Sequence, residues 1–237
     1  MSIKKTYRFL GLMILALTLV LMPGVSRAAM WVGGEIGGNF MANANIKVGN
    51  ATIHNIKFDP QVIGGITMGY DFVNAGFLGY AWPDWMKYFS VAADFTYNQL
   101  NLTSLGNIAT NSNVSGHAAV LTFLFMAHYG FMPDSEVPSG RINPYIGVGP
   151  AIVFSEIDFT LPVARATLNT NSRFGASATN VALVVEPGIR WVALKNVSID
   201  TAFRWRYMVP SWTAGANTLK LDPLNQWSFL VRANLHF

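Results

Sequence analysis

The feature that most constrains this chain is a two-residue alternation of apolar and polar side chains, repeated in long segments. The last twelve residues, QWSFLVRANLHF at 226–237, show it clearly, because every second side chain counted back from Phe237 is apolar. A period of two is typical of a β-strand with one apolar face. The pattern therefore predicts a sheet protein whose final strand ends on an aromatic residue.

Eight segments of the chain carry this strand pattern. We predict strands at 30–40, 58–72, 88–100, 117–131, 143–158, 180–193, 197–208 and 226–237. Each has about 11–16 residues, whereas strands of globular proteins usually have about five or six. A tilted strand that crosses a membrane needs roughly 9–11 residues in the hydrocarbon. Pro150 and Pro187 cannot donate to a strand ladder, so we expect bulges or weak pairing at these two positions.

The composition agrees with a protein whose surface faces lipid. Hydrophobic residues make up 51% of the chain and charged residues only 12%, against about a quarter in typical soluble domains. After the N-terminal segment, the longest apolar stretch is 118–132, and Thr122 and His128 interrupt it. In hydrocarbon, only helices and closed barrels satisfy their backbone hydrogen bonds. We therefore predict an all-β fold, an eight-stranded antiparallel up-and-down transmembrane β-barrel.

The first 28 residues have the three-part layout of a secretory signal peptide. Basic residues lie within the first eight positions, an apolar run follows at 9–22, and a small-residue exit ends at Ala28. The apolar run is short for a membrane-spanning helix, which needs roughly 20 residues. The alternative is an uncleaved anchor helix. We predict cleavage at or next to Ala28, a signal peptide at 1–28 and a barrel domain at 29–237.

Removing residues 1–28 changes the charge balance. The chain has 16 basic and 12 acidic residues, and four of the basic residues but no acidic one lie in 1–28. The mature chain therefore has 12 of each, which leaves no electrostatic argument for a nucleic-acid partner. The chain has no cysteine, so it has neither a thiolate nucleophile nor a cysteine metal site.

The polar faces of the predicted strands carry charged residues that would point into the barrel. These are Glu35, Asp71, Asp94, Glu186, Arg190, Asp200, Arg204, Arg206, Arg232 and His236. Buried charges are costly unless they pair, so we expect a network of ion pairs. Eight strands leave a lumen that side chains can fill. We predict a sealed plug, with a conducting or gated path as the alternative.

Seven glycines on the inward faces are expected to give the long arginines room. They are Gly33, Gly37, Gly65, Gly69, Gly147, Gly149 and Gly188. Six tryptophans are predicted to lie at the membrane interfaces, where amphipathic rings gather. They are Trp31, Trp82, Trp85, Trp191, Trp205 and Trp227. Trp82 and Trp85 belong to segment 73–87, which we expect to form a short interfacial helix or belt.

The connections between strands form two sets. Segments 41–57, 101–116, 159–179 and 209–225 are rich in Asn, Thr, Ser, Ala and Gly, and we expect them to be surface loops. Segments 73–87, 132–142 and 194–196 would face the periplasm. We predict that the first set forms the interaction surface, whose partner the sequence leaves unknown.

Three stretches resemble a known family. WVGGEIGGNF at 31–40, INPYIGVGPAIVFSE at 142–156 and FLVRANLHF at 229–237 resemble the outer-membrane β-barrel domain of OmpA, OmpX and opacity-type proteins. The resemblance implies an integral protein of the bacterial outer membrane, exported through the periplasm, and we expect it to be a monomer surrounded by outer-membrane lipid. It also implies that Phe237 is an assembly signal for the barrel assembly machinery. The chain ends with the barrel, so no cell-wall tether is expected.

Members of such families serve membrane integrity, adhesion or small-solute passage, and the fold alone does not choose among these roles. We predict a structural or surface-interaction protein. The alternatives are a small-solute pore or carrier and an enzyme that modifies the acyl chains of lipid A.

Acyl-chain chemistry would need a nucleophile, a base and an orienting acid near the outer leaflet. Ser115 and His117 are the best candidate pair, at the edge of a predicted surface loop, whereas His236 lies at the periplasmic end. The His-x-Ser order of lipid A deacylases is missing. We expect no catalytic activity, and no metal or cofactor either, because the histidines are scattered and no acidic cluster has ligand spacing.

Overall fold

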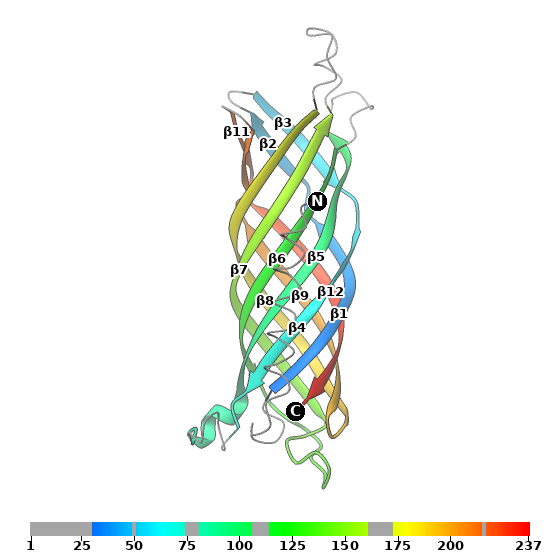
Figure 1. Cartoon of the computed structure of the whole chain (residues 1–237), viewed down its shortest axis with the longest axis vertical. Coiled ribbons are helices and arrows are strands. Elements are labelled where there is room, and N and C mark those ends of the chain that lie inside the picture. Colours follow the sequence, from blue (N-terminus) through cyan, green and yellow to red (C-terminus); the bar gives the residue numbers. More distant parts are fainter. Residues whose placement is uncertain (1–29, 49–50, 74–80, 106–113, 161–172, 215–216) are drawn as a thin grey trace, which may run out of the picture.

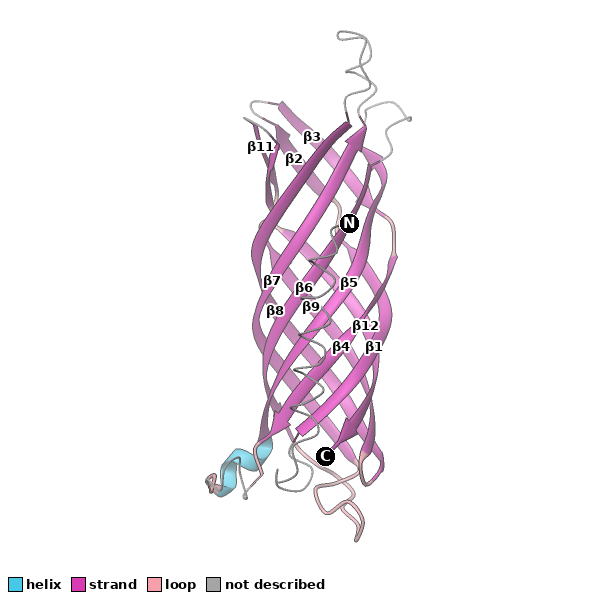
Figure 2. Ribbon diagram, in the orientation of Figure 1, coloured by secondary structure: helices cyan, strands magenta, loops and turns pink. Residues whose placement is uncertain are grey.

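The computed structural model describes residues 30–48, 51–73, 81–105, 114–160, 173–214 and 217–237. These residues form one antiparallel sheet that closes on itself as a tall barrel (Figure 1). Figure 2 shows that nearly all of this structure is strand and that a short helix lies at the lower end. None of the helices in the described ranges is long and apolar enough to cross a membrane.

The sheet consists of twelve strand segments. They are β1 (Met30–Met41), β2 (Ala44–Val48), β3 (Ala51–Phe58), β4 (Gln61–Asp71), β5 (Phe89–Leu105), β6 (Val114–His128), β7 (Ile142–Thr160), β8 (Arg173–Leu194), β9 (Val197–Met208), β10 (Ser211–Ala214), β11 (Asn217–Leu221) and β12 (Leu224–His236). The short 3-10 helix η2 (Asp84–Tyr88) lies between β4 and β5. Short interruptions divide four of the eight barrel strands into two segments each. The divided strands are β1 with β2, β3 with β4, β9 with β10, and β11 with β12.

The barrel closes because β12 pairs with both β1 and β9. From β1 the order continues through β4, β5, β6, β7 and β8 back to β9, and every pairing is antiparallel. Met30 and Phe237 also exchange backbone hydrogen bonds of 2.9 and 3.3 Å, so both ends of the described chain lie at the lower end of the barrel (Figure 1). The predicted fold class, a closed eight-stranded antiparallel barrel, is confirmed.

The boundaries of the strands differ from the prediction at the upper end. Segments 41–57 and 209–225, which we expected to be loops, contain β2, β3, β10 and β11. The strands β5, β7 and β8 also extend into expected loop segments. The alternation is present there only in short pieces, such as ANIKV at 44–48 and NTLKL at 217–221, and these do not stand out from the polar composition of the segments. Residues 49–50, 106–113, 161–172 and 215–216 of these segments lie outside the described residues.

Pro150 and Pro187, where weak pairing was predicted, interrupt the ladder without shifting it. The pairing of β6 with β7 is absent between Thr122–Ala151 and Phe125–Val148, next to Pro150, and resumes in the same register. The pairing of β8 with β9 is absent in the same way around Pro187. Weak pairing was predicted correctly at both positions, because proline has no N–H to donate, but neither position is a bulge.

Apolar side chains cover the outer wall. Ile36, Val62, Ile66 and Val181 are all more than half exposed, although they are large and hydrophobic. The inward side chains are almost fully buried. On β6, the inward positions from Ala118 to Met126 are mostly apolar as well, which explains why this strand is apolar on both faces. The lumen is therefore filled by a charged network packed against an apolar wall.

Candidate functional site in the barrel lumen

The centre of the lumen holds three carboxylates and two arginines within direct contact. Arg204 donates from Nε to Glu186 at 2.6 Å and from Nη2 to Asp94 at 2.5 Å. Arg232 donates from Nε to Glu35 at 2.5 Å. Its two terminal nitrogens bind both oxygens of Glu186, at 2.5 and 2.9 Å, as a bidentate fork. All five side chains are buried. We call them the central cluster.

The register of the barrel brings the central cluster together. Its members come one each from β1, β5, β8, β9 and β12, always from the inward face. Glu35 and Arg232, far apart in the sequence, lie directly opposite each other in the β1–β12 pair. Because each guanidinium contacts at least two carboxylates, no single ion pair can be removed without leaving a buried charge.

Tyr145 is a member of this site that the sequence analysis did not identify. Its hydroxyl accepts a hydrogen bond from Arg232 Nη1 at 3.1 Å and lies 3.4 Å from Glu186 Oε1, to which it donates. Gly188 makes room for the ring, since a Cβ at this glycine would lie 2.4 Å from a Tyr145 ring carbon. The alternation of β7 places Tyr145 on the inward face, and this pattern is the sequence signal that could have identified it as a member of the site.

A second group of charges lies nearer the lower end. Arg190 donates to Asp200 and to Asp71, each at 3.4 Å. Its guanidinium carbon also lies 4.9 Å from the ring centroid of Trp31, as a cation–π contact. The indole N–H of Trp31 donates to Asp71 at 3.2 Å. This lower group therefore combines ion pairs with an aromatic ring.

The position of Trp31 contradicts its prediction as an interface aromatic. The side chain is only 2% exposed and points into the lumen, on the same face of β1 as Glu35. A Cβ at Gly69 would lie 2.2 Å from the Trp31 ring. Gly69 and Gly188 were expected to make room for arginines, but the space beside them holds aromatic rings.

Two of the ten predicted charges, His236 and Arg206, form no ion pair with an opposite charge among the described residues. The imidazole Nε2 of His236 contacts the hydroxyl of Ser198 at 2.9 Å. Arg206 donates from Nη1 to Gln226 at 3.0 Å, although it is 1% exposed. Its neighbours across the two adjacent strands are Gln226 and Val184, and both are uncharged. The expectation that every lumenal charge is paired is wrong for these two residues.

The other five tryptophans that were predicted to lie at the interface are at least partly exposed. Trp85 and Trp191 are 59% and 50% exposed, and Trp205 and Trp227 lie opposite each other on the outer face. Trp82 donates to the hydroxyl of Tyr70 at 3.3 Å. Trp85 belongs to η2, so a short helix does form within the predicted segment. Their location at the membrane interface stays a prediction.

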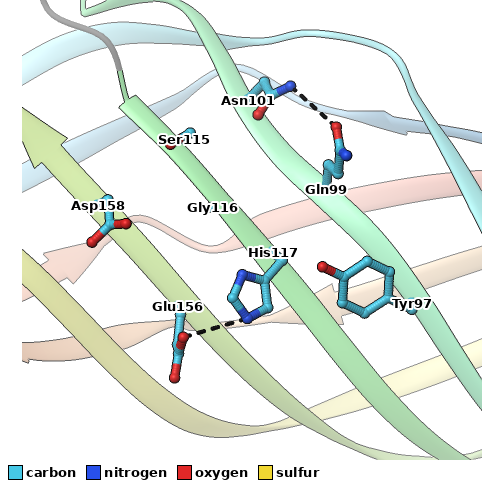
Figure 3. Close-up of a pocket in the computed structure, with 8 residues that line it drawn as sticks. All are labelled: Tyr97, Gln99, Asn101, Ser115, Gly116, His117, Glu156 and Asp158. Carbon is cyan, nitrogen blue, oxygen red and sulfur yellow. Dashed lines mark hydrogen bonds and ion pairs between the residues drawn. The ribbon is translucent and has the colours of Figure 1, made fainter. Parts of the chain in front are cut away.

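The candidate catalytic pair lies on the outer wall. Figure 3 shows His117 and Ser115 on β6 beside Glu156 of β7. His117 Nε2 lies 3.4 Å from Glu156, and both side chains are well exposed. Within the described part of the chain, no hydrogen bond joins Ser115 to His117. The imidazole therefore has an acidic partner, but the geometry of an activated serine is not formed.

Comparisons with known proteins give the following. Residues 12–237 match the family described as "Outer membrane protein beta-barrel domain". Among solved structures, Neisserial surface protein A is 12% identical, with a TM-score of 0.48 and coverage of 90% of this chain and 99% of the other. Ail of Yersinia pestis, in complex with the heparin analogue sucrose octasulfate, is 10% identical, with a TM-score of 0.46 and coverage of 88% and 99%.

The N-terminal β-barrel domain of Pseudomonas aeruginosa OprF is also 10% identical, with a TM-score of 0.44 and coverage of 90% of this chain and all of the other. No curated protein matches this sequence at a significant level.

Proposed function

Because the chain belongs to the outer membrane protein β-barrel domain family, we propose that it is a closed barrel that acts through its surface rather than through its lumen. The protein is located in the bacterial outer membrane. In barrels of this kind short turns face the periplasm and longer loops face outward. The end that carries Met30 and Phe237 is then the periplasmic end, and the opposite rim is the outer end.

The central cluster is the observation that carries this proposal. Its five side chains reach across the lumen from five strands and are buried. An ion that passes this level must separate charge-assisted hydrogen bonds in a site with little water, which costs several kcal/mol. Continuous conduction through a lumen of this kind is therefore unfavourable, and the alternative of a small-solute pore is not supported.

The outer rim is the proposed interaction surface. The β2–β3 and β10–β11 hairpins meet there, because β2 pairs with β11. Together they extend the wall above the divided strands, since β3 also pairs with β5 and β10 with β8. We assign the partners as outer-membrane lipid around the wall and the barrel assembly machinery at Phe237 during insertion. The protein would act as a monomer.

Electrical recording tests the proposal. The purified mature chain in planar bilayers is expected to give no steady conductance steps, whereas the double variant Arg204→Ser, Arg232→Ser should give small ones or leak. Lys87→Ser, in η2 outside the lumen, is the matched control and should stay silent. Steady single-channel steps from the unaltered protein would rule out a closed lumen and favour the pore.

A further inference from the structure

The polarity of the barrel wall reverses toward the outer end. At the level of the central cluster, outward side chains such as Val148 are apolar and exposed, and the inward ones are charged. Nearer the outer end of the same strand, Glu156 and Asp158 face outward, and Ile157 between them is buried. Leu100 of β5 is buried at the same end. Because a carboxylate that faces hydrocarbon is unfavourable, we infer that this part of the wall lies outside the hydrocarbon of the membrane.

A groove of about 310 Å³ lies on this part of the outer wall (Figure 3). It crosses β5, β6 and β7, and Gln99, His117 and Glu156 are direct cross-strand neighbours within it. The register therefore brings side chains from three strands to one place on the outside of the barrel. We call this place the outer-wall groove, and the residues that line it include Tyr97, Gln99, Asn101, His117, Glu156 and Asp158.

The outer-wall groove has a negative electrostatic character. The carboxylates of Glu156 and Asp158 line it, and none of the described residues that line it is Lys or Arg. The Nε2 of His117 lies 3.4 Å from Glu156, and these two side chains are 44% and 67% exposed. A ligand can therefore reach the carboxylate of Glu156 from outside. A concave surface with one sign of charge attracts the opposite sign, so the groove favours a positively charged group.

The opposite side of the groove supplies an aromatic ring and two amides. Tyr97 is 49% exposed, and its ring centroid lies 5.8 Å from that of His117. Asn101 donates from Nδ2 to Oε1 of Gln99 at 3.5 Å, so the two amides lie next to each other. Figure 3 shows these three side chains on β5, across β6 from the carboxylates of β7. An aromatic face attracts C–H groups and cations, and an amide offers donors and an acceptor in one plane.

We propose that the outer-wall groove binds an amino sugar with a free ammonium group. The ammonium contacts the carboxylates of Glu156 and Asp158, and the C–H face of the ring packs on Tyr97. The hydroxyl groups exchange hydrogen bonds with Gln99 and Asn101. A volume of about 310 Å³ is at the small end of ligand pockets, which suits one sugar ring. A phosphorylated or sulfated sugar would meet two carboxylates and is disfavoured.

An amino sugar can reach the groove from two sources. A neighbouring glycolipid presents it as a head group, because the groove opens sideways next to the apolar wall, and a free glycan presents it from solution. Access from the exterior rests on the orientation given with the proposed function. Binding to the purified barrel in detergent micelles depends neither on that orientation nor on whether the lumen conducts, so the two proposals can fail separately.

Saturation-transfer NMR on the mature barrel in micelles tests the inference. The probe is methyl glucosaminide in its ammonium form, with empty micelles as the blank. Methyl glucoside supplies the ring without the charge, methylammonium supplies the charge without the ring, and a glucose phosphate carries the opposite charge. The glucosaminide is expected to bind saturably and the other three about tenfold more weakly or less, since charge-assisted or ring contacts are lost.

A second titration identifies the source of the sugar. Dodecyl glucosaminide in lipid nanodiscs presents the same unit as a membrane head group, and methyl glucosaminide added to plain nanodiscs presents it as a free sugar. Binding of either one supports the site, and the one that binds more tightly is the source that the groove favours.

Two variants separate the two sides of the groove. The double variant Glu156→Gln, Asp158→Asn removes the charges, and Tyr97→Leu removes the ring. Each is expected to weaken glucosaminide binding about tenfold or more, and the double variant should leave the weak binding of methyl glucoside unchanged. Glu136→Gln and Tyr129→Leu change the same residue types at the lower end of the barrel and should bind as the unaltered protein does. Migration of heated and unheated samples on a gel verifies that each variant is folded.

Four results would overturn the proposal. Methylammonium binding as tightly as the glucosaminide would reveal a site for small cations alone. Methyl glucoside binding as tightly would show that the carboxylates have no role. Tighter binding of the glucose phosphate would reveal a site for anionic sugars. Absence of saturable glucosaminide binding to a folded barrel, in micelles and in nanodiscs, would exclude the site altogether.

Discussion

At the scale of single residues, two arginines on β9 show how the position of a side chain decides its energetic role. Arg204 and Arg206 are two residues apart and face the same lumen. Arg204 contacts the carboxylates of Asp94 and Glu186, whereas Arg206 donates to the amide of Gln226 and forms no ion pair within the described ranges. Identical side chains on one strand should therefore respond differently to the same substitution.

Replacing each arginine with methionine measures this difference. Arg204→Met leaves buried carboxylates without a partner and is expected to lower the free energy of unfolding by about 3–5 kcal/mol. Arg206→Met strands no carboxylate and should be close to neutral or stabilising. Urea unfolding in detergent micelles gives both values. Equal losses for the two variants would mean that the ion pairs of the central cluster do not hold the lumen together.

Gly69 is predicted to be required by the ring of Trp31. Gly69→Ala places a Cβ 2.2 Å from that ring and should destabilise the barrel by about 1–3 kcal/mol, because a close-packed interior resists added volume. Gly34→Ala is the matched control, since its Cβ would meet nothing within 4 Å. The measurement is the urea midpoint of each variant, and a midpoint for Gly69→Ala that equals that of the control would show that the ring can move aside freely.

At the scale of elements, the alternation predicted which face of each strand points inward but not which strands meet. It put Glu35, Arg204 and Arg232 on inward faces, and their contacts depend on the β1–β12–β9 register, which a single sequence does not specify. The same alternation places Trp31 inward. The general preference of tryptophan for membrane interfaces led to the opposite prediction, because the local packing against Gly69 is visible only in three dimensions.

Loop boundaries were the other part that the sequence could not predict. Above β1 and β9 the strands continue only as short segments, β2 and β10, and an alternation over four or five residues is too short to predict a strand. Pairing continues there because the backbone N–H and C=O groups need hydrogen-bond partners whatever side chains the residues carry. The lack of a counter-ion for Arg206 was invisible for a related reason, since only the register places Gln226 and Val184 beside it.

The connection between β6 and β7 makes a prediction about pH. Backbone N–H groups, first of all that of Val137, and the guanidinium of Arg141 donate to the carboxylate of Asp134, and they lower its pKa below the usual value of 3.8. Arg141 also donates to the carbonyls of Val192 and Ala193, which ties this turn to the end of β8. The carboxylate therefore stabilises the turn above pH 3.8, and this contribution disappears as the pH falls through the lowered pKa.

NMR titration of the Asp134 carboxyl group measures the effect. The pKa is expected below 3.8 in the unaltered protein and closer to that value in Arg141→Ala, because one donor is removed. Glu136→Gln removes the second carboxylate that Arg141 contacts and should leave the Asp134 pKa low. A pKa at or above 3.8 in the unaltered protein would contradict the contacts of this turn.

At the scale of the whole molecule, one arrangement accounts for the composition, the closure and the charges. Large apolar side chains cover the outer wall, and a chain of charged and polar side chains fills the interior. The same sequence in water would expose its hydrophobic surface and aggregate. In the outer membrane, lipid covers that surface, and the closed sheet leaves no unpaired edge.

Site-specific labelling of β12 tests this arrangement most directly. The chain has no cysteine, so a single cysteine at Phe229, Leu230, Val231 or Asn234 can carry a unique spin label in the bilayer. The account predicts strong relaxation by oxygen at 229 and 231, which face lipid, and weak relaxation by both oxygen and a water-soluble nickel complex at 230 and 234, which face the sealed lumen. Equal oxygen access at all four positions, or access of the nickel complex at 230 and 234, would contradict it.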